Sequence, residues 1–250
     1  MSEDLYEGFA DRYDWFFSQF DDYHPDVKAF FHKVFTDHGV ANVLDCACGT
    51  GRDLALFQSL GVDVHGSDSS SSMLAQAEKN FTERGLNIPL KNADYRELTH
   101  VFTTKFDAVV CLSSSLLHMP DEQEALKALT SMRRVLRDNG ILILTQGTTD
   151  KQWKQKPRFI PAVITSEFSR IFVIDYIAEG ARYNILDIFS GQDGPGFKVF
   201  SVDYPFMILR DDQERLLKDA GFQQIKFFGG YGFELYDKAE SDQLITVACT

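Results

Sequence analysis

Cysteine is scarce in this sequence, which has only four such residues among 250. A disulfide-rich secreted domain would have many more, whereas 44% apolar residues are enough for one large domain with its own core. Cys46 and Cys48 form a C-x-C pair, but two ligands of one kind are too few for a metal site. We therefore predict no metal, and reduced thiols that act as small packing residues.

Long apolar runs are also absent, since no segment approaches the roughly 20 apolar residues that span a bilayer. The first residues, Met1 to Leu5, are acidic and lack the apolar stretch of a secretion signal, so we expect a cytoplasmic protein. Basic residues are few, 25 against 37 acidic ones, which gives a net charge of -12. Nucleic-acid binding usually requires a basic surface, so the expected partner is a small-molecule substrate. The sequence leaves open whether the protein forms a homo-oligomer.

What the sequence does contain is a glycine turn after an apolar run, Val-Leu-Asp-Cys-Ala-Cys-Gly-Thr-Gly at residues 43–51. Glycine lets the backbone approach a ligand closely. The third glycine of a dinucleotide-binding loop is missing, because Leu54 occupies its place. Asp45, at the predicted strand end, disfavours a phosphate and favours a cation, and Asp68 can accept the hydroxyl groups of a ribose. S-adenosylmethionine, which has a ribose, an ammonium group and no phosphate, fits this pattern.

Apolar strands alternate with amphipathic helices after residue 43, which predicts a parallel sheet covered on both faces. Ligands of such sheets lie beyond the carboxyl ends of the strands. Further on, residues 168–177, 181–189 and 198–209 predict three antiparallel strands separated by turn residues. The expected fold class is α/β: a doubly wound, Rossmann-like, mostly parallel seven-stranded sheet with a small antiparallel β insertion between strand five and the last helix.

This pattern divides the chain into three parts. Residues 1–149 are expected to form an N-terminal cap helix and the S-adenosylmethionine-binding core, residues 150–209 the inserted strands as a substrate lid, and residues 210–250 the last helix and strands of the core. Aromatic residues at near-helical spacing in residues 5–35 predict a helix there, and its role as a cap over the cofactor site is what the family resemblance of the glycine turn implies. Core packing is the alternative for these aromatic residues.

The glycine turn resembles motif I of the class I S-adenosylmethionine-dependent methyltransferases, and residues 47–51 resemble the glycine N-methyltransferase type. The likeness continues at residues 106–112, 118–121, 194–197 and 204–205. It implies that the chain binds S-adenosylmethionine and releases S-adenosylhomocysteine. The cofactor-binding residues that the turn and the resemblance imply together are Tyr13, Asp45, Ala47, Gly49, Thr50, Gly51, Asp68, Ser69, Met73, Asp94, Tyr95, Leu112 and His118.

Some of these residues have a competing structural interpretation. The resemblance implies that Asp94 accepts a hydrogen bond from the adenine amine while Tyr95 flanks the ring, but Asp94 also fits a solvated loop acid. Tyr13 either touches the cofactor or packs in the core. His118 either contacts the cofactor or is a structural histidine at a helix start.

The acceptor side is where the sequence departs from the family that it resembles. The resemblance implies that Ser114 faces the substrate, and Tyr183 and Tyr204 are the candidates for the acceptor pocket, with packing as their alternative. The glycine-methylating enzymes hold the carboxylate of the amino acid with an arginine just after strand five, whereas this chain reads Thr-Gln-Gly-Thr at 145–148. The nearest cations, Lys151, Lys154, Lys156 and Arg158, form either a solvated loop or a lid that recruits an anionic acceptor.

The main hypothesis is a methyltransferase that acts on a small-molecule acceptor, at the nitrogen of a glycine- or sarcosine-like amine. A sulfonium methyl group is already electrophilic, so transfer needs alignment and exclusion of water more than an acid, a base or a metal, and no catalytic residue is assigned. A small-molecule O-methyltransferase is equally compatible with the core motifs. A non-catalytic protein that senses S-adenosylmethionine is the third possibility, and a nicotinamide-dependent oxidoreductase would need the missing glycine.

Overall fold

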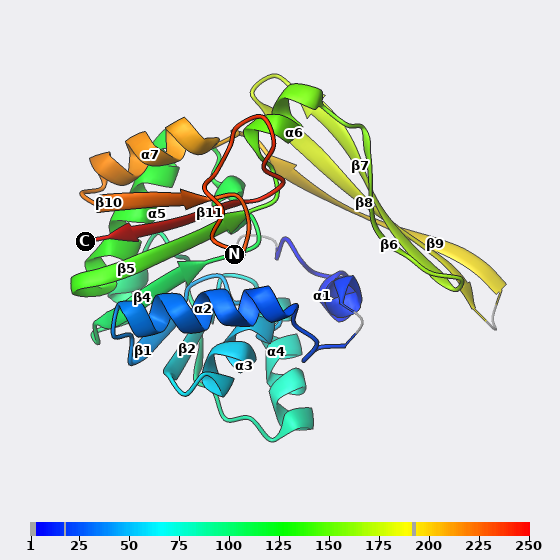
Figure 1. Cartoon of the computed structure of the whole chain (residues 1–250). Coiled ribbons are helices and arrows are strands. Elements are labelled where there is room, and N and C mark those ends of the chain that lie inside the picture. The colour runs from blue at the N-terminus through cyan, green and yellow to red at the C-terminus, as the bar shows by residue number, and fades with distance from the viewer. Residues whose placement is uncertain (1–3, 18, 192–193) are drawn as a thin grey trace.

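The larger of two sheets forms the core of the molecule. The computed structural model describes residues 4–17, 19–191 and 194–250. The core sheet has the strand order β10-β11-β5-β4-β1-β2-β3, in which the pairs among β1 to β5 are parallel and β10 and β11 are antiparallel. The predicted doubly wound, mostly parallel seven-stranded sheet is confirmed (Figure 1). Its strands are β1 (Asn42–Asp45), β2 (Asp63–Asp68), β3 (Leu90–Asn92), β4 (Phe106–Cys111), β5 (Leu136–Gln146), β10 (Gln223–Phe228) and β11 (Leu244–Cys249).

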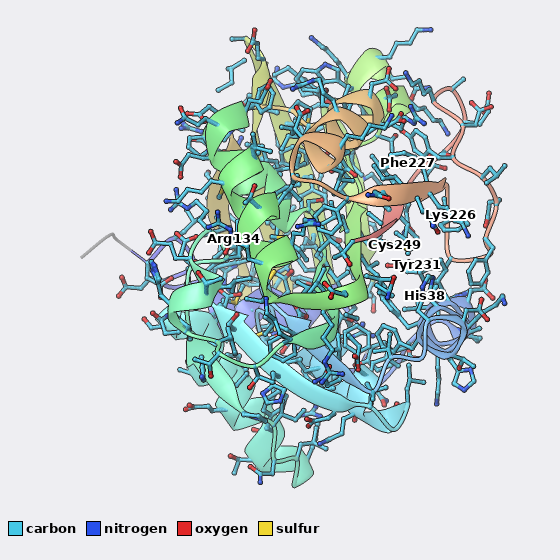
Figure 2. All side chains as sticks on the ribbon, turned by 90° about the vertical axis from the view of Figure 1, so that its left-hand side faces the viewer. His38, Arg134, Lys226, Phe227, Tyr231 and Cys249 are labelled. Atoms are coloured by element: carbon cyan, nitrogen blue, oxygen red, sulfur yellow. The ribbon has the colours of Figure 1, made fainter. Side chains whose placement is uncertain are left out.

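Helices cover both faces of the core sheet because side chains alternate along its strands. In β1, Val43 packs with the cluster of α2, α3 and α4, whereas Leu44 packs with that of α5 and α7. Figure 2 shows the two sides, with Arg134 on α5 and His38 at the end of α2. In the described ranges no helix is long and apolar enough to cross a membrane. The main helices are α2 (Pro25–Asp37), α3 (Arg52–Ser59), α4 (Ser71–Arg84), α5 (Glu122–Val135) and α7 (Arg210–Asp219).

The second sheet is antiparallel and has the strand order β6-β7-β8-β9. It projects from the core as a long arm after the short helix α6 (Asp150–Gln155) (Figure 1). It contains four strands, so the prediction of three is wrong: β6 (Phe159–Ile164) was not expected. The other strands are β7 (Phe168–Ile177), β8 (Gly180–Gly191) and β9 (Gly194–Tyr204). Pro161 lies in β6, where it is tolerated because β6 is an edge strand.

The N-terminal leader is not one helix, so the predicted cap is shorter than expected. It forms α1 (Ala10–Tyr13) and a 3₁₀ turn, Asp14–Phe16, after which the backbone of Phe17 is extended. Pro25 then starts α2, which packs on the core sheet. Residues 4–17, which we call the N-terminal segment, lie between the carboxyl ends of the parallel strands and the second sheet (Figure 1).

Two element boundaries in the core differ from the sequence patterns, which predict a helix over 121–137 that is stopped by Asn139-Gly140 and a third strand over 86–90. The helix expected over 121–137 ends at Val135, and β5 begins at Leu136, before the predicted stop at Asn139-Gly140. Asn139 adopts a left-handed conformation with φ of 63° within β5, so this turn signal does not separate the helix from the strand. The third strand occupies Leu90–Asn92 and not 86–90. Remaining short turns of 3₁₀ helix lie at Leu98–His100 and Ser115–His118.

Candidate active site

The glycine turn connects the end of β1 to the start of α3, as predicted. Gly51 has a left-handed backbone with φ of 83°, and a Cβ atom there would lie 2.4 Å from the ring of Phe81. Position 51 therefore requires glycine for both its conformation and its space. Cys46 and Cys48 are buried, and all four cysteines are free thiols. Nowhere in the described part of the chain do three or more metal-ligating side chains gather.

Asp68, at the end of β2, ties the glycine turn to α4. One carboxylate oxygen accepts a hydrogen bond from the backbone N–H of Gly49 at 2.9 Å, and the other accepts from the N–H of Ser70 at 2.9 Å. Ser70 in turn caps α4, because its hydroxyl oxygen accepts from the N–H of Met73 at 3.1 Å. The predicted residues Gly49 and Asp68 are thus in direct contact.

Three acidic side chains gather beneath the turn. Asp45 is only 2% exposed, and Asp53 and Asp68 are partly buried. Burial raises the pKa of each carboxyl group, that of Asp45 well above its ordinary value, and the neighbouring charge of Asp53 adds to the effect on Asp45. None of the three forms a salt bridge with a residue in the described ranges. Such a cluster of unpaired buried acids is suited to a ligand cation.

The N-terminal segment is fastened over this end of the core by two acidic residues. Asp14 accepts hydrogen bonds from the hydroxyl of Thr50 at 2.5 Å and from the amide of Asn80 at 2.9 Å. Asp4 accepts from the N–H of Ser72 at 2.8 Å, at the start of α4. These bonds lower the pKa of Asp4 to about 2, although burial opposes the shift. The segment is therefore held to the glycine turn and to α4.

Between the segment and the turn lies a small space of about 40 Å³, which we call the turn crevice. It holds little more than one water molecule, whose share of liquid volume is about 30 Å³. Five of the predicted cofactor-binding residues line it. Its lining residues are Tyr13, Phe17, Ala47, Cys48, Gly49, Thr50, Arg52, Asp53, Leu112, Ser113 and Ser115.

The other predicted cofactor residues lie near the crevice or behind it. Asp94 forms a bidentate ion pair with Arg96, whose Nε lies 3.0 Å from each carboxylate oxygen, and this contact lowers the pKa of Asp94 against its partial burial. Tyr95 is buried in the core and donates its hydroxyl to the carbonyl of Ser115 at 2.9 Å. Ser69 and Met73 stand at the start of α4. These four predicted residues are not in the described lining of the turn crevice.

His118 meets the N-terminal segment and the second sheet. Its Nε2 lies 2.9 Å from the hydroxyl of Tyr6, and its ring packs edge-on against Tyr204 with centroids 5.1 Å apart. Burial lowers the pKa of His118 to about 4, so the imidazole is neutral at pH 7. A neutral imidazole nitrogen can accept a hydrogen bond from the hydroxyl group of Tyr6.

A much larger space, which we call the aromatic cavity, opens beside the turn crevice and has a volume of about 660 Å³. It lies between the N-terminal segment, the second sheet and α6. The predicted acceptor residues Ser114, Tyr183 and Tyr204 all line it. The cavity and the turn crevice share the wall formed by Tyr13, Phe17 and Ser113, so the two spaces adjoin. The aromatic lining consists of Tyr6, Phe9, Tyr13, Phe16, Phe17, Phe172, Tyr183, Phe200 and Tyr204.

The backbone after β4 is bent so that it reaches both spaces. Ser113 and Ser114 are both left-handed, with φ of 55° and 68°, a conformation that is costly for residues other than glycine. The N–H of Ser113 donates to the hydroxyl oxygen of Thr145, near the end of β5, at 2.9 Å, and the N–H of Ser114 donates to the carbonyl oxygen of Thr145 at 2.8 Å. These two hydrogen bonds hold the loop after β4, and with it Ser113 of the shared wall, against the end of β5.

The cation cluster predicted around residues 151–158 contributes only Lys151 to the cavity lining that the structure describes. Arg158 instead pairs with Asp175, with N···O of 3.2 Å, and Lys156 lies over the Trp153 ring at 5.0 Å. Gln146, at the position considered for a substrate-binding arginine, is buried and donates its amide to the carbonyls of Thr148 and Ile208. Gly147 is the residue of the 145–148 stretch that is both exposed and part of the cavity wall.

A buried ion cluster, which sequence reasoning missed, joins the N-terminal segment to the second sheet. Asp187 of β8 is fully buried and accepts from Arg170 of β7 at 2.6 and 2.9 Å, and also from Arg12. Arg170 is fully buried too, and it donates to the carbonyl of Arg12 at 2.9 Å. The clue in the sequence was the hairpin register, which places Arg170 directly opposite Asp187. We call these three residues the latch.

Comparisons with known proteins agree with this geometry. A model of a family described as a methyltransferase domain matches residues 43–140. Glycine/sarcosine N-methyltransferase of Aphanothece halophytica is 30% identical over 97% of this chain and 88% of its own. An S-adenosylmethionine-dependent methyltransferase structure from Clostridium acetobutylicum matches with a TM-score of 0.79 at 18% identity, covering 98% of each chain. CalS10, an amino pentose methyltransferase from Micromonospora echinaspora with S-adenosylmethionine bound, has a TM-score of 0.73 at 19% identity. The match covers 100% of this chain and 98% of the CalS10 chain.

These matches extend over the core and the second sheet alike, since the aligned relative covers nearly the whole chain. The distant structures support the fold, and the closer sequence relative supports the family. The chain belongs to the class I S-adenosylmethionine-dependent methyltransferases of the glycine N-methyltransferase-like type.

Proposed function

We propose that this methyltransferase acts on the nitrogen of a small-molecule amine. The observation that carries the proposal is the wall of Tyr13, Phe17 and Ser113, which separates a crevice at the cofactor turn from a cavity able to hold an acceptor. The relative from Aphanothece halophytica, whose name states N-methylation of glycine and sarcosine, supports transfer to nitrogen.

The cofactor site is proposed around the glycine turn. The unpaired carboxylate of Asp45 would hold the methionyl ammonium, and the oxygens of Asp68, which keep free lone pairs beside their two backbone bonds, would accept ribose hydroxyls. Asp94 would accept a hydrogen bond from the adenine amine while its carboxylate stays paired with Arg96. The backbone from Ala47 to Gly51 would form the floor of the site. The remaining contacts would come from Tyr13, Ser69, Met73, Tyr95, Leu112 and His118.

The chemistry requires position more than proton transfer. When bound, the cofactor supplies a methyl group on a positively charged sulfur. The amine lone pair forms the new N–C bond as the S–C bond breaks, sulfur keeps that electron pair, and one proton leaves the methylated nitrogen. Correct alignment alone can account for about 7–11 kcal/mol of the barrier. The aromatic walls would exclude water, and the second sheet, within the insertion at residues 150–209, would hold the acceptor through Tyr183, Tyr204 and, from the core, Ser114.

The test has a binding step and a transfer step. Titration calorimetry should show S-adenosylmethionine binding that Asp68→Asn weakens at least tenfold, with NADH as the negative control. Labelled S-adenosylmethionine should then transfer its methyl group to members of an amine panel and not to matched alcohols or carboxylic acids. Binding without transfer to any amine would reject the proposal and favour a sensor, and transfer to the alcohols or acids would favour O-methylation.

A further inference from the structure

The size of the aromatic cavity exceeds what glycine or sarcosine requires. Its volume of about 660 Å³ lies within the roughly 300–1,000 Å³ range of pockets that enclose drug-sized ligands. Only the wall shared with the turn crevice is next to the cofactor turn, so most of the space belongs to the acceptor side. An amino acid without a side chain would leave most of this cavity filled with water.

The walls of the cavity are suited to an apolar body. Phe9 and Phe200 stack with ring centroids 4.2 Å apart, and Tyr183 and Tyr204 pack edge-on at 5.0 Å. Ile160, Ile185 and Val202 add aliphatic surface between the rings. Burial of apolar ligand surface contributes about 25 cal/mol per Å², so a bulky apolar body would bind here and a small polar one would not.

The cavity has no unengaged cation for a carboxylate in its described lining, where Lys151 is the single basic residue. Its Nζ lies 2.9 Å from the carboxylate of Asp242 and 3.1 Å from the carbonyl of Glu240, and the contact with Asp242 raises the pKa of Lys151. Asp242 also lines the cavity and would repel an anion. A substrate carboxylate would therefore have to displace an existing ion pair without the bidentate contact of an arginine.

One polar atom in the lining has no partner within the described chain. Oε1 of Gln152, on α6, is shielded from solvent and accepts no hydrogen bond, while its Nε2 lies 3.5 Å from the hydroxyl of Tyr183. A buried acceptor without a donor is destabilising because its lost hydration is not replaced, and a ligand donor would remove that cost. The amide oxygen is thus available to an N–H or O–H group of the acceptor.

We infer that the acceptor is an amine with a bulky, largely apolar body and no carboxylate, and that Gln152 binds one of its N–H or O–H groups. This inference rests on the proposed N-methyltransferase function. It predicts that specificity follows from the apolar body in the aromatic cavity, in contrast to the carboxylate recognition expected for a glycine-like substrate.

The direct test compares matched acceptors on the wild-type chain with labelled S-adenosylmethionine. 2-Phenylethylamine should have a kcat/KM at least tenfold above those of phenylalanine, glycine and sarcosine, because it has the apolar body without the carboxylate. If glycine, sarcosine or phenylalanine is preferred, the inference is wrong while the N-methyltransferase function stands. If none of the four is methylated, the inference is rejected; the N-methyltransferase function is rejected with it only if no amine of the wider panel is methylated while cofactor binding is intact.

A second test supplies the missing positive charge. Gly147 lines the cavity, its φ lies outside the left-handed range, and a Cβ atom there would meet nothing within 4 Å, so longer side chains fit. Gly147→Arg should raise the ratio of kcat/KM for phenylalanine to that for 2-phenylethylamine about tenfold, and the neutral control Gly147→Gln should not. An equal ratio in both variants would contradict the inference, because it would mean that the wild-type cavity already neutralises the carboxylate.

The role of Gln152 has its own readout. Gln152→Leu should raise KM for 2-phenylethylamine about tenfold and leave the affinity for S-adenosylmethionine within twofold, since Gln152 lies outside the lining of the turn crevice. An unchanged KM would remove Gln152 from the inference. A parallel loss of cofactor affinity would show a general structural effect and would also count against a specific contact.

Discussion

The turn crevice and the aromatic cavity share one wall and differ in nearly every other property. The crevice is about 40 Å³ and has Asp53, whose pKa is raised by burial, in its lining, whereas the cavity is about 660 Å³ and has nine aromatic rings in its described lining. The crevice is built by the core strand ends and the cavity by the second sheet, and the N-terminal segment closes both.

The difference matches the two substrates of a methyltransferase, one of which is a cation. Acidic charge beneath the glycine turn suits the cationic methyl donor, while the shape and polarity of the cavity depend on the inserted strands. The N-terminal segment is the only described part, besides the loop after β4, that contributes to both spaces. Four changes to the chain or its conditions would break or sharpen this contrast.

The largest effect is expected from the latch. Asp187→Asn leaves the buried guanidinium group of Arg170 without its counter-charge and leaves Arg12 only the exposed carboxylate of Asp11 at 3.8 Å, so the free energy of unfolding should fall by about 3–5 kcal/mol. Both cofactor affinity and acceptor KM should worsen, because the shared wall loosens. The matched control is Asp203→Asn, which breaks the exposed ion pair with Arg182 on the same sheet and should cost less than about 1 kcal/mol. Urea denaturation of the two variants compares these costs, and equal losses would contradict a special role for the latch.

A pair of substitutions should separate the two spaces functionally. Asp45→Asn keeps the oxygen that accepts from the N–H of Ala47 but removes the charge, and should weaken S-adenosylmethionine binding about tenfold to hundredfold. Tyr183→Phe removes a hydroxyl that bonds Thr148 at 2.8 Å in the cavity, and should raise acceptor KM severalfold with cofactor affinity unchanged. Calorimetry and initial rates measure the two effects. If each variant impaired both ligands equally, the two sites would not be separable.

A pH titration should affect the crevice only. The carboxyl groups of Asp45, Asp53 and Asp68 have raised pKa values, so they are partly protonated above the usual range of aspartate, and a cationic ligand binds the ionised forms better. Affinity for S-adenosylmethionine should therefore continue to rise with pH above the ordinary titration range of aspartate, and Asp45→Asn should flatten that rise. His118, with a pKa of about 4, stays neutral in this range. Affinity that falls or stays level with rising pH would contradict the acid cluster as the cation site.

The smallest effect is expected outside both spaces. Lys154 and Arg158 were considered as parts of an acceptor-recruiting lid, but neither lines the cavity as described. The double variant Lys154→Ala, Arg158→Ala should leave acceptor KM within about twofold, since exposed ion pairs contribute at most about 1 kcal/mol. A clear rise of KM for an anionic acceptor would restore the lid hypothesis.

Local patterns were enough to predict the core of the fold. The strand at 168–177 has the predicted bounds, because a segment rich in β-forming residues ends at the turn residues Glu179 and Gly180. The glycine turn was predictable because the apolar run, the two glycines and the helix after them follow one another directly in the sequence. These features depend on neighbours in the sequence.

Features that depend on distant parts of the chain were not predictable. Arg170 and Asp187 have the pattern of solvent-facing residues on strands, and only the approach of the N-terminal segment buries them. The leader has helical spacing, but bonds from Asp14 to Thr50 and Asn80 hold it in a shorter, broken form. The opening of the acceptor space likewise follows from how two sheets face each other, which no local pattern contains.

Tyr13 and Phe17 of the N-terminal segment line both the turn crevice and the aromatic cavity, and this affects the order in which the two substrates can bind. If S-adenosylmethionine binds at the turn crevice, as proposed, a space of about 40 Å³ is too small for it while the N-terminal segment is in place, so the segment would have to move out and would take one wall of the aromatic cavity with it. The amine would then find a complete pocket only after the segment had closed over the methyl donor. Initial-rate kinetics should accordingly show compulsory addition, donor first, with S-adenosylhomocysteine leaving last and competing with the donor at every amine concentration.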